Sequence, residues 1–114
     1  MEINETDILN LIDVALGYVK DKALEEMLRN LAAVQREYYK KKAEQGRKKS
    51  TEIIKNMAKV DIEVCRLNQS YEKLKAAGKL PKDGCESIDS LIRRLQIQRE
   101  EFLKEKKRLE KQRN

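Results

Sequence analysis

The chain has 114 residues, of which 40% are Asp, Glu, Lys or Arg and 39% are hydrophobic. Its 26 basic and 20 acidic residues give a net charge of +6. This composition cannot easily fill a thick globular core, whereas long helices bury narrow apolar stripes and leave most side chains in water. One Pro and four Gly also supply too few turns for a β-sandwich or barrel, which needs one every ~8–12 residues. We therefore expect a single all-α domain over residues 1–114.

Several function classes are disfavoured by the same composition. The sequence contains no His, which excludes an imidazole base and a His metal site. Cys65 and Cys85 are far apart, without CxxC spacing, so both are interpreted as reduced thiols. No apolar run approaches a membrane span, and the N-terminal residues are acidic where a signal peptide is basic. We expect no enzyme activity, catalytic residue, cofactor, metal, membrane contact or small-molecule substrate, and a cytoplasmic location, or a nuclear one in a eukaryote.

The first helical segment covers about residues 5–44. Asn4 or Thr6 can cap it, and apolar residues recur every three or four positions up to Val19. The next apolar residue, Leu24, follows after five positions, which a straight helical stripe does not accommodate. Asp21 can act as a second N-cap. The segment is therefore either one bent helix or two helices that meet near residue 20, and the break is favoured.

Residues 40–49 are strongly basic, with a net charge of +5. Gly46 lies in their middle, and Ser50-Thr51-Glu52 resembles a helix start. A hairpin tip fits these features. A continuous helix also fits, because most of these residue types favour helices and one Gly costs only ~1 kcal/mol. The hairpin is the favoured interpretation.

Residues 50–77 carry the clearest pattern in the chain. Apolar side chains alternate there in steps of four and three over three heptads, which favours a coiled-coil seam. Gly78 and Pro81 predict a turn over residues 78–84. A further helix is expected over about 85–112, with an apolar residue every seven positions. The prediction is an elongated antiparallel helical bundle, or coiled-coil hairpin, of three long helices.

The favoured function is a non-enzymatic protein–protein interaction module that acts in assembly or regulation of a larger complex. Its expected association seam consists of Ile53, Met57, Val60, Val64, Leu67, Tyr71, Leu74, Ile88, Leu95 and Phe102. Six further apolar residues fall off the main stripes and are expected to need cover from a homodimer or another protein. They are Leu9, Leu16, Leu24, Ile54, Ile62 and Ile97.

The alternative is a basic helical module that binds the phosphate backbone of nucleic acid. In an antiparallel bundle, the basic tip and the basic C-terminal region lie at the same end, as phosphate binding requires. The contact residues for nucleic acid or an acidic partner are then Lys40, Lys41, Lys42, Arg47, Lys48, Lys49, Lys106, Lys107 and Arg108. The competing explanation is that these charges only keep an elongated protein soluble.

Overall fold

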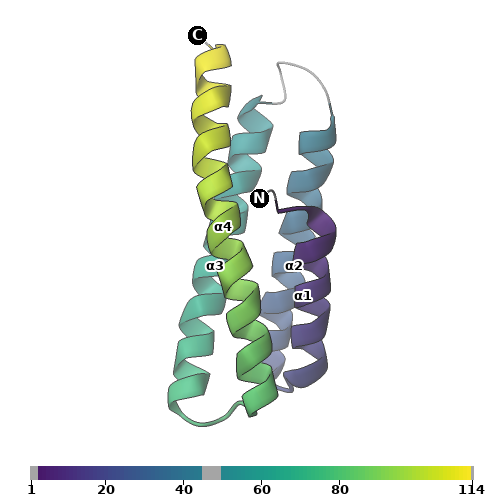
Figure 1. Cartoon of the computed structure of the whole chain (residues 1–114), viewed down its shortest axis with the longest axis vertical. Helices are drawn as coiled ribbons and strands as arrows, with labels where there is room; N and C mark the ends of the chain where they lie inside the picture. The colour runs from purple at the N-terminus through teal and green to yellow at the C-terminus, as the bar shows by residue number, and fades with distance from the viewer. Residues whose placement is uncertain (1–2, 45–49, 114) are drawn as a thin grey trace.

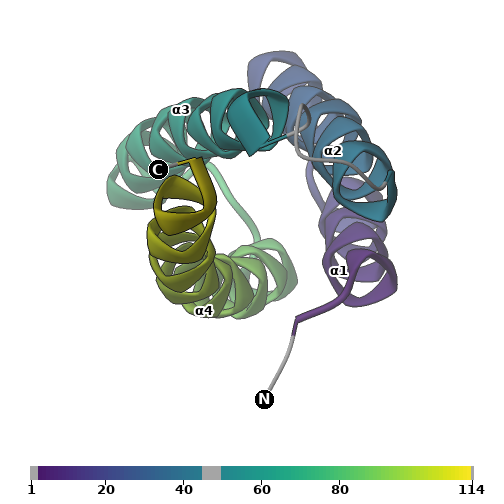
Figure 2. The ribbon, with the colours of Figure 1, turned by 90° about the horizontal axis from the view of Figure 1, so that it is seen from above.

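The fold is described by a computed structural model, which defines residues 3–44 and 50–113. Within these residues the chain forms four helices: α1 (Glu5–Tyr18), α2 (Lys22–Ala43), α3 (Ser50–Ala76) and α4 (Lys82–Arg113). Successive helices run in opposite directions (Figure 1). Viewed along the bundle, they follow one another around it, and each packs on two neighbours (Figure 2). The molecule measures 50 × 25 × 20 Å.

The favoured break near residue 20 is confirmed, and the prediction of three helices is therefore wrong. Val19 has an extended backbone, which ends α1. The Asp21 carboxylate accepts a hydrogen bond from the Leu24 amide at 2.9 Å, so it caps a new helix. Leu24 is fully buried, contrary to the prediction that it needs outside cover. Because a new helix begins at Lys22, its buried side is no longer in register with the apolar stripe of α1. Leu24 lies off the stripe only if the two helices are treated as one.

The chain reverses between α2 and α3, as the hairpin interpretation predicted. Helix α2 ends at Ala43, and α3 starts at Ser50 and runs antiparallel to it (Figure 1). Lys40, Lys41 and Lys42 belong to the last turn of α2. Arg47, Lys48 and Lys49, which were also predicted as contact residues, lie outside the described residues.

The turn between α3 and α4 is shorter than predicted. Gly78 has a positive φ of 67°, which explains the need for glycine there. Helix α4 begins at Lys82 instead of residue 85, because the carbonyl of Pro81 already accepts a hydrogen bond from the Cys85 amide at 3.0 Å. The helices on either side of the turn are antiparallel, but each also packs on a further helix. The coiled-coil hairpin therefore stays a prediction, while the helical bundle is observed.

A polar cluster lies inside the bundle where α1 begins. Gln35 and Gln98 are fully buried and exchange two amide hydrogen bonds of 2.8 and 2.7 Å. The Gln98 amide also donates to the Tyr39 hydroxyl at 3.2 Å. The backbone amide of Ile3 donates to Glu101 on α4 at 2.8 Å. The Ile3–Glu101 bond ties the start of α1 to α4 about half-way along the bundle, and α2, α3 and α4 extend beyond it (Figure 1).

Candidate interaction surfaces

The predicted association seam forms much of the chain's own core. Eight of its ten residues are buried, while Val64 and Leu74 are half-buried and pack against the core. Tyr71 is fully buried, and its hydroxyl donates to Asp89 at 2.6 Å, with the Cys85 carbonyl oxygen at 3.1 Å. Burial, followed by the Asp89 hydrogen bond and charge, raises the pKa of Tyr71. The seam thus packs α3 and α4 into the bundle, and little of it is left exposed for contacts with other molecules.

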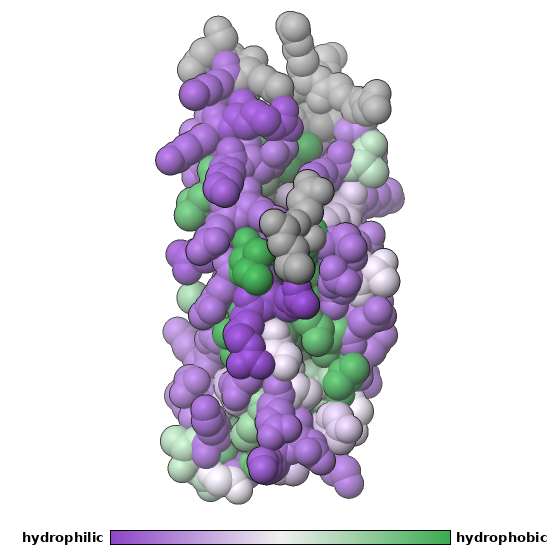
Figure 3. All heavy atoms as spheres, viewed as in Figure 1, coloured by the Kyte–Doolittle hydropathy of each residue, from purple (hydrophilic) through white to green (hydrophobic). Residues whose placement is uncertain are grey.

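Among the described residues, four large apolar side chains are clearly exposed. Val14 and Tyr18 lie on α1, Ile62 on α3 and Leu103 on α4, with exposed fractions between 46% and 56%. Ile62 was expected from its off-stripe position, whereas the other off-stripe residues besides Leu24 are half-buried. On the face seen in Figure 3, hydrophilic side chains cover most of the surface and hydrophobic ones gather in small patches over α1 and α4.

A shallow groove runs along the outside of the bundle between α3 and α4. It contains two neighbouring hollows of about 160 and 130 Å³, and both are lined by Asp61 and Arg99. Its apolar walls come from both helices: Ile54, Met57, Ala58, Val60 and Val64 on α3, and Ile92, Leu95, Phe102 and Leu103 on α4. The Leu103 side chain is 56% exposed. Ile62 is exposed on α3 and does not line either hollow.

The charges in this groove come from Asp61 on α3 and from Arg99 and Lys106 on α4. Burial raises the pKa of Asp61, and the positive charges of Arg99 and Lys106 oppose that rise. The groove therefore combines an apolar floor with a net positive charge among its lining residues. An apolar surface with charged residues beside it is typical of a site that binds an amphipathic helix.

The basic residues of α2 and α4 do lie at one end of the molecule, where both helices finish (Figure 1). Lys40, Lys42, Lys106 and Lys107 are exposed. Two of the others have acidic partners. Lys41 lies 3.6 Å from Glu52 on α3, and Arg108 forms a bidentate ion pair with Glu105.

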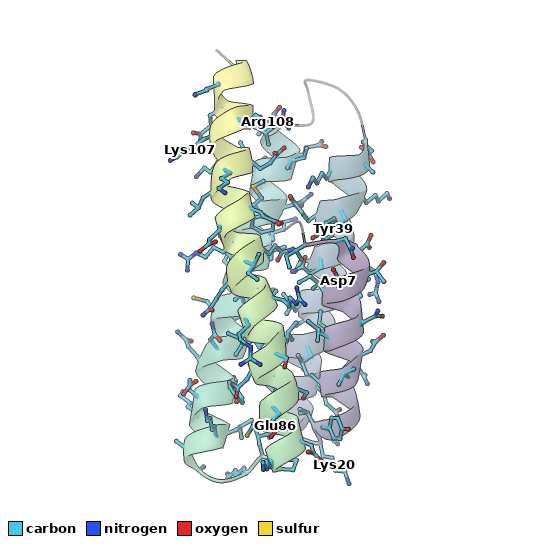
Figure 4. The ribbon with its side chains drawn as sticks, viewed as in Figure 1. Asp7, Lys20, Tyr39, Glu86, Lys107 and Arg108 are labelled. Carbon is cyan, nitrogen blue, oxygen red and sulfur yellow. The ribbon has the colours of Figure 1, made fainter. Side chains whose placement is uncertain are left out.

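These basic side chains do not converge on one surface. Consecutive residues of a helix point about 100° apart, so Lys106, Lys107 and Arg108 leave α4 in different directions (the last two are labelled in Figure 4). The positive charge of Lys106 opposes the rise in the pKa of Asp61 in the groove. The Arg108 hydrogen bond, together with the charges of Arg108 and Lys42, lowers the pKa of Glu105.

The two adjacent tyrosines beside this end do not form an exposed stacking platform. Tyr38 is buried, with its ring centroid 4.7 Å from that of Phe102. Tyr39 is half-buried, and its hydroxyl bonds with Gln98 and the Ile3 carbonyl. Burial raises the pKa of both hydroxyls. Base stacking needs an open aromatic face, whereas these two rings pack against each other and Tyr38 also packs against Phe102.

Within residues 3–44 and 50–113, no three His, Cys, Asp or Glu side chains are placed to hold a metal ion. No helix there has both the length and the apolar character that crossing a membrane requires. Comparisons of the chain with protein-family models, curated proteins and solved structures found no significant match. Function is therefore inferred from the chain's own geometry.

Many of the groove's lining residues were named in the sequence analysis, but no groove was predicted. Met57, Val60, Val64, Leu95 and Phe102 were placed in a seam, Ile54 among residues needing cover and Lys106 in a basic surface, whereas Asp61, Arg99 and Leu103 had no role. The spacing of α3 contains a partial signal, since Ile54 and Ala58 follow one another at a four-residue step beside the heptad stripe. Recognising a groove also requires knowing which side of α3 meets α4, and that depends on the packing of all the helices.

Proposed function

We propose that this protein is a non-enzymatic helical interaction module that acts in assembly or regulation of a larger complex, and that its α3–α4 groove binds a helix. The observation that carries the proposal is the exposure of Leu103 in the wall of an apolar hollow, among described residues whose large apolar side chains are mostly covered. A bundle gains nothing from leaving this side chain in water. Fully burying a side chain of this size contributes about 1.5–3 kcal/mol, so covering it on binding is favourable.

Site-specific photo-crosslinking in the cell tests this proposal. A photoreactive amino acid replaces Leu103 in the groove, and a matched control replaces Arg36, which is exposed on α2. We expect discrete protein adducts from position 103 and none from position 36. A partner identified in this way must bind the purified chain in a defined stoichiometry and lose affinity for Leu103→Asp. Equal labelling at both positions, or no adduct at 103, contradicts a docking groove.

Nucleic-acid binding is the second candidate, and the shared end occupied by Lys40, Lys42 and Lys107 is the observation in its favour. It is the weaker candidate because neighbouring basic side chains diverge or have acidic partners. The test is binding to a labelled ~20-mer duplex and single strand at low and moderate salt. Tight binding that falls steeply with salt, and that disappears in a Lys40→Gln/Lys42→Gln/Lys107→Gln variant, favours this candidate over helix docking.

The proposed compartment is the cytoplasm, or the nucleus in a eukaryote. Cys65 is exposed and Cys85 is half-buried, and both are free thiols. An exposed free thiol is compatible with a reducing compartment, where disulfides seldom form. Fractionation of cells that express the tagged chain tests this assignment.

A further inference from the structure

The outer face of α1 has three features that play no part in the packing of its own bundle. It carries the exposed apolar side chains of Val14 and Tyr18, one helical turn apart. Its charged residues, Asp7 and Asp13, are both acidic. Hydrophobic side chains over α1 are visible among the polar ones in Figure 3, and Asp7 is labelled near the start of this helix in Figure 4.

The third feature is Gly17, which lies on this face next to Val14 and Tyr18. Its φ is not positive, and a β-carbon added to it would meet nothing within 4 Å. Neither the backbone of α1 nor the packing of the bundle therefore requires glycine at this position. A glycine in a helix allows another backbone to approach closely, so this position leaves room for a neighbouring helix.

The α3–α4 groove matches this face in length and in polarity. Helix α1 has 14 residues, which span about 21 Å at 1.5 Å per residue. The groove extends from Ile54 to Asn68 on α3, again about 21 Å by the same rise. The apolar floor of the groove fits an apolar stripe such as the one around Val14 and Tyr18.

The charges of the two surfaces are complementary. The helix segment Glu5–Tyr18 contains three acidic residues and no basic one. Arg99 and Lys106 line the groove together with Asp61, so its lining residues carry a net positive charge. Opposite charges facing each other across an interface favour encounter and fix its orientation. Lys106, one of the predicted basic contact residues, thus lies where it can face an acidic helix.

We propose that the occupant of the groove is α1 of a second copy of this chain. The inference rests on the proposed function and specifies its partner. A chain cannot fill its own groove, because its α1 packs against α2 and α4 in the same bundle (Figure 2). The contact joins two different surfaces, so it is head-to-tail, and each added chain leaves one α1 face and one groove open. Chains of more than two copies form as the concentration rises.

Sedimentation velocity of the full chain, from micromolar to near-millimolar concentration, tests this assignment. The samples are the wild type, Val14→Asp on the α1 face, Leu103→Asp in the groove, and an equimolar mixture of the two variants. Val14 and Leu103 are about half exposed, so each variant is expected to keep its fold, which helical circular dichroism checks. Burying an added carboxylate in the contact raises the dissociation constant at least about tenfold.

The mixture gives the decisive result. We expect wild-type mass to increase beyond a dimer, each variant alone to stay at 13.4 kDa, and the mixture to stop at a dimer through one intact face from each partner. If Val14→Asp self-associates as the wild type does, the contact does not use α1 and the inference is wrong. A monomeric wild type also overturns it, but the crosslink from position 103 then still decides the proposed function independently.

Gly17→Ala provides a second variant that does not depend on introducing a charge. The methyl group has open space in the single chain and alanine favours a helix, so the monomer is expected to melt at a higher temperature. At the same time, self-association is expected to weaken several-fold because the second backbone can no longer approach. Unchanged association together with a higher melting temperature contradicts a close contact at this face.

Discussion

The buried Gln35–Gln98 pair offers the sharpest test of how the bundle is held together. Both side chains are at most 1% exposed, and their amides exchange two short hydrogen bonds between α2 and α4. Gln98→Leu replaces one amide by an apolar group of similar volume. The Gln35 amide then keeps its burial but loses both the donor and the acceptor that faced it.

The expected destabilisation follows from this geometry. A buried polar group without a partner costs about 1–3 kcal/mol, and Tyr39 also loses the amide that donates to its hydroxyl. We therefore expect Gln98→Leu to lower the free energy of unfolding by about 2–3 kcal/mol. In the double variant Gln35→Leu/Gln98→Leu no unpaired amide remains, so its stability is expected to lie within about 1 kcal/mol of the wild type.

Urea unfolding followed by circular dichroism measures both effects as a double-mutant cycle. Gln69→Leu is the control, because Gln69 is exposed on α3 and its replacement is expected to change stability by less than about 0.5 kcal/mol. A Gln98→Leu variant as stable as this control would show that the two amides are not hydrogen-bonded to each other in solution. A double variant as unstable as the sum of the single ones would refute the reciprocal pairing.

Three further predictions concern single side chains. Asp21→Ala removes the carboxylate that accepts a hydrogen bond from the Leu24 amide at the start of α2. We expect this to lower the free energy of unfolding by about 1 kcal/mol, measured in urea. Gly17→Ala is expected to stabilise the dilute monomer by about 0.5–1 kcal/mol, measured in the same way. Tyr71→Phe removes the hydrogen bond to Asp89 and is expected to cost about 1.5–3 kcal/mol near neutral pH. Because the pKa of Tyr71 is raised from 10.0 in the folded state, wild-type stability is retained below pH 10 and falls above it, and the fall is expected to be smaller in Tyr71→Phe.

Local signals in the sequence were enough to predict most of the helical elements. The five-residue step from Val19 to Leu24, with Asp21 between them, identified the break. An N-cap residue and a shift in the apolar stripe can both be recognised within a few residues of sequence. Gly78 and Pro81 identified the reversal before α4 for the same reason. The predicted start of α4 was late by three residues, since Pro81 can accept the first helical hydrogen bond through its carbonyl and so begins the helix directly.

The surfaces were much harder to predict than the helices. The heptads of α3 indicate that Met57 and Val60 face another helix, but they do not indicate whether that helix belongs to the same chain. The exposure of Val14 and Leu103 depends on where α1 stops and on how α3 and α4 are spaced. Likewise, the described basic residues of α2 and α4 lie near one end as predicted, but their divergence and the Arg108–Glu105 pair depend on side-chain directions.

The most direct test of the interaction account is the mass of the purified chain as a function of concentration, compared between the wild type and Leu103→Asp. We predict that the wild-type mass increases from 13.4 kDa toward that of a dimer and larger species, while Leu103→Asp stays at the monomer mass with the same helical content. Identical monomer masses at every concentration would contradict self-association through the groove. Equal association of the two proteins would show that the α3–α4 groove is not the contact.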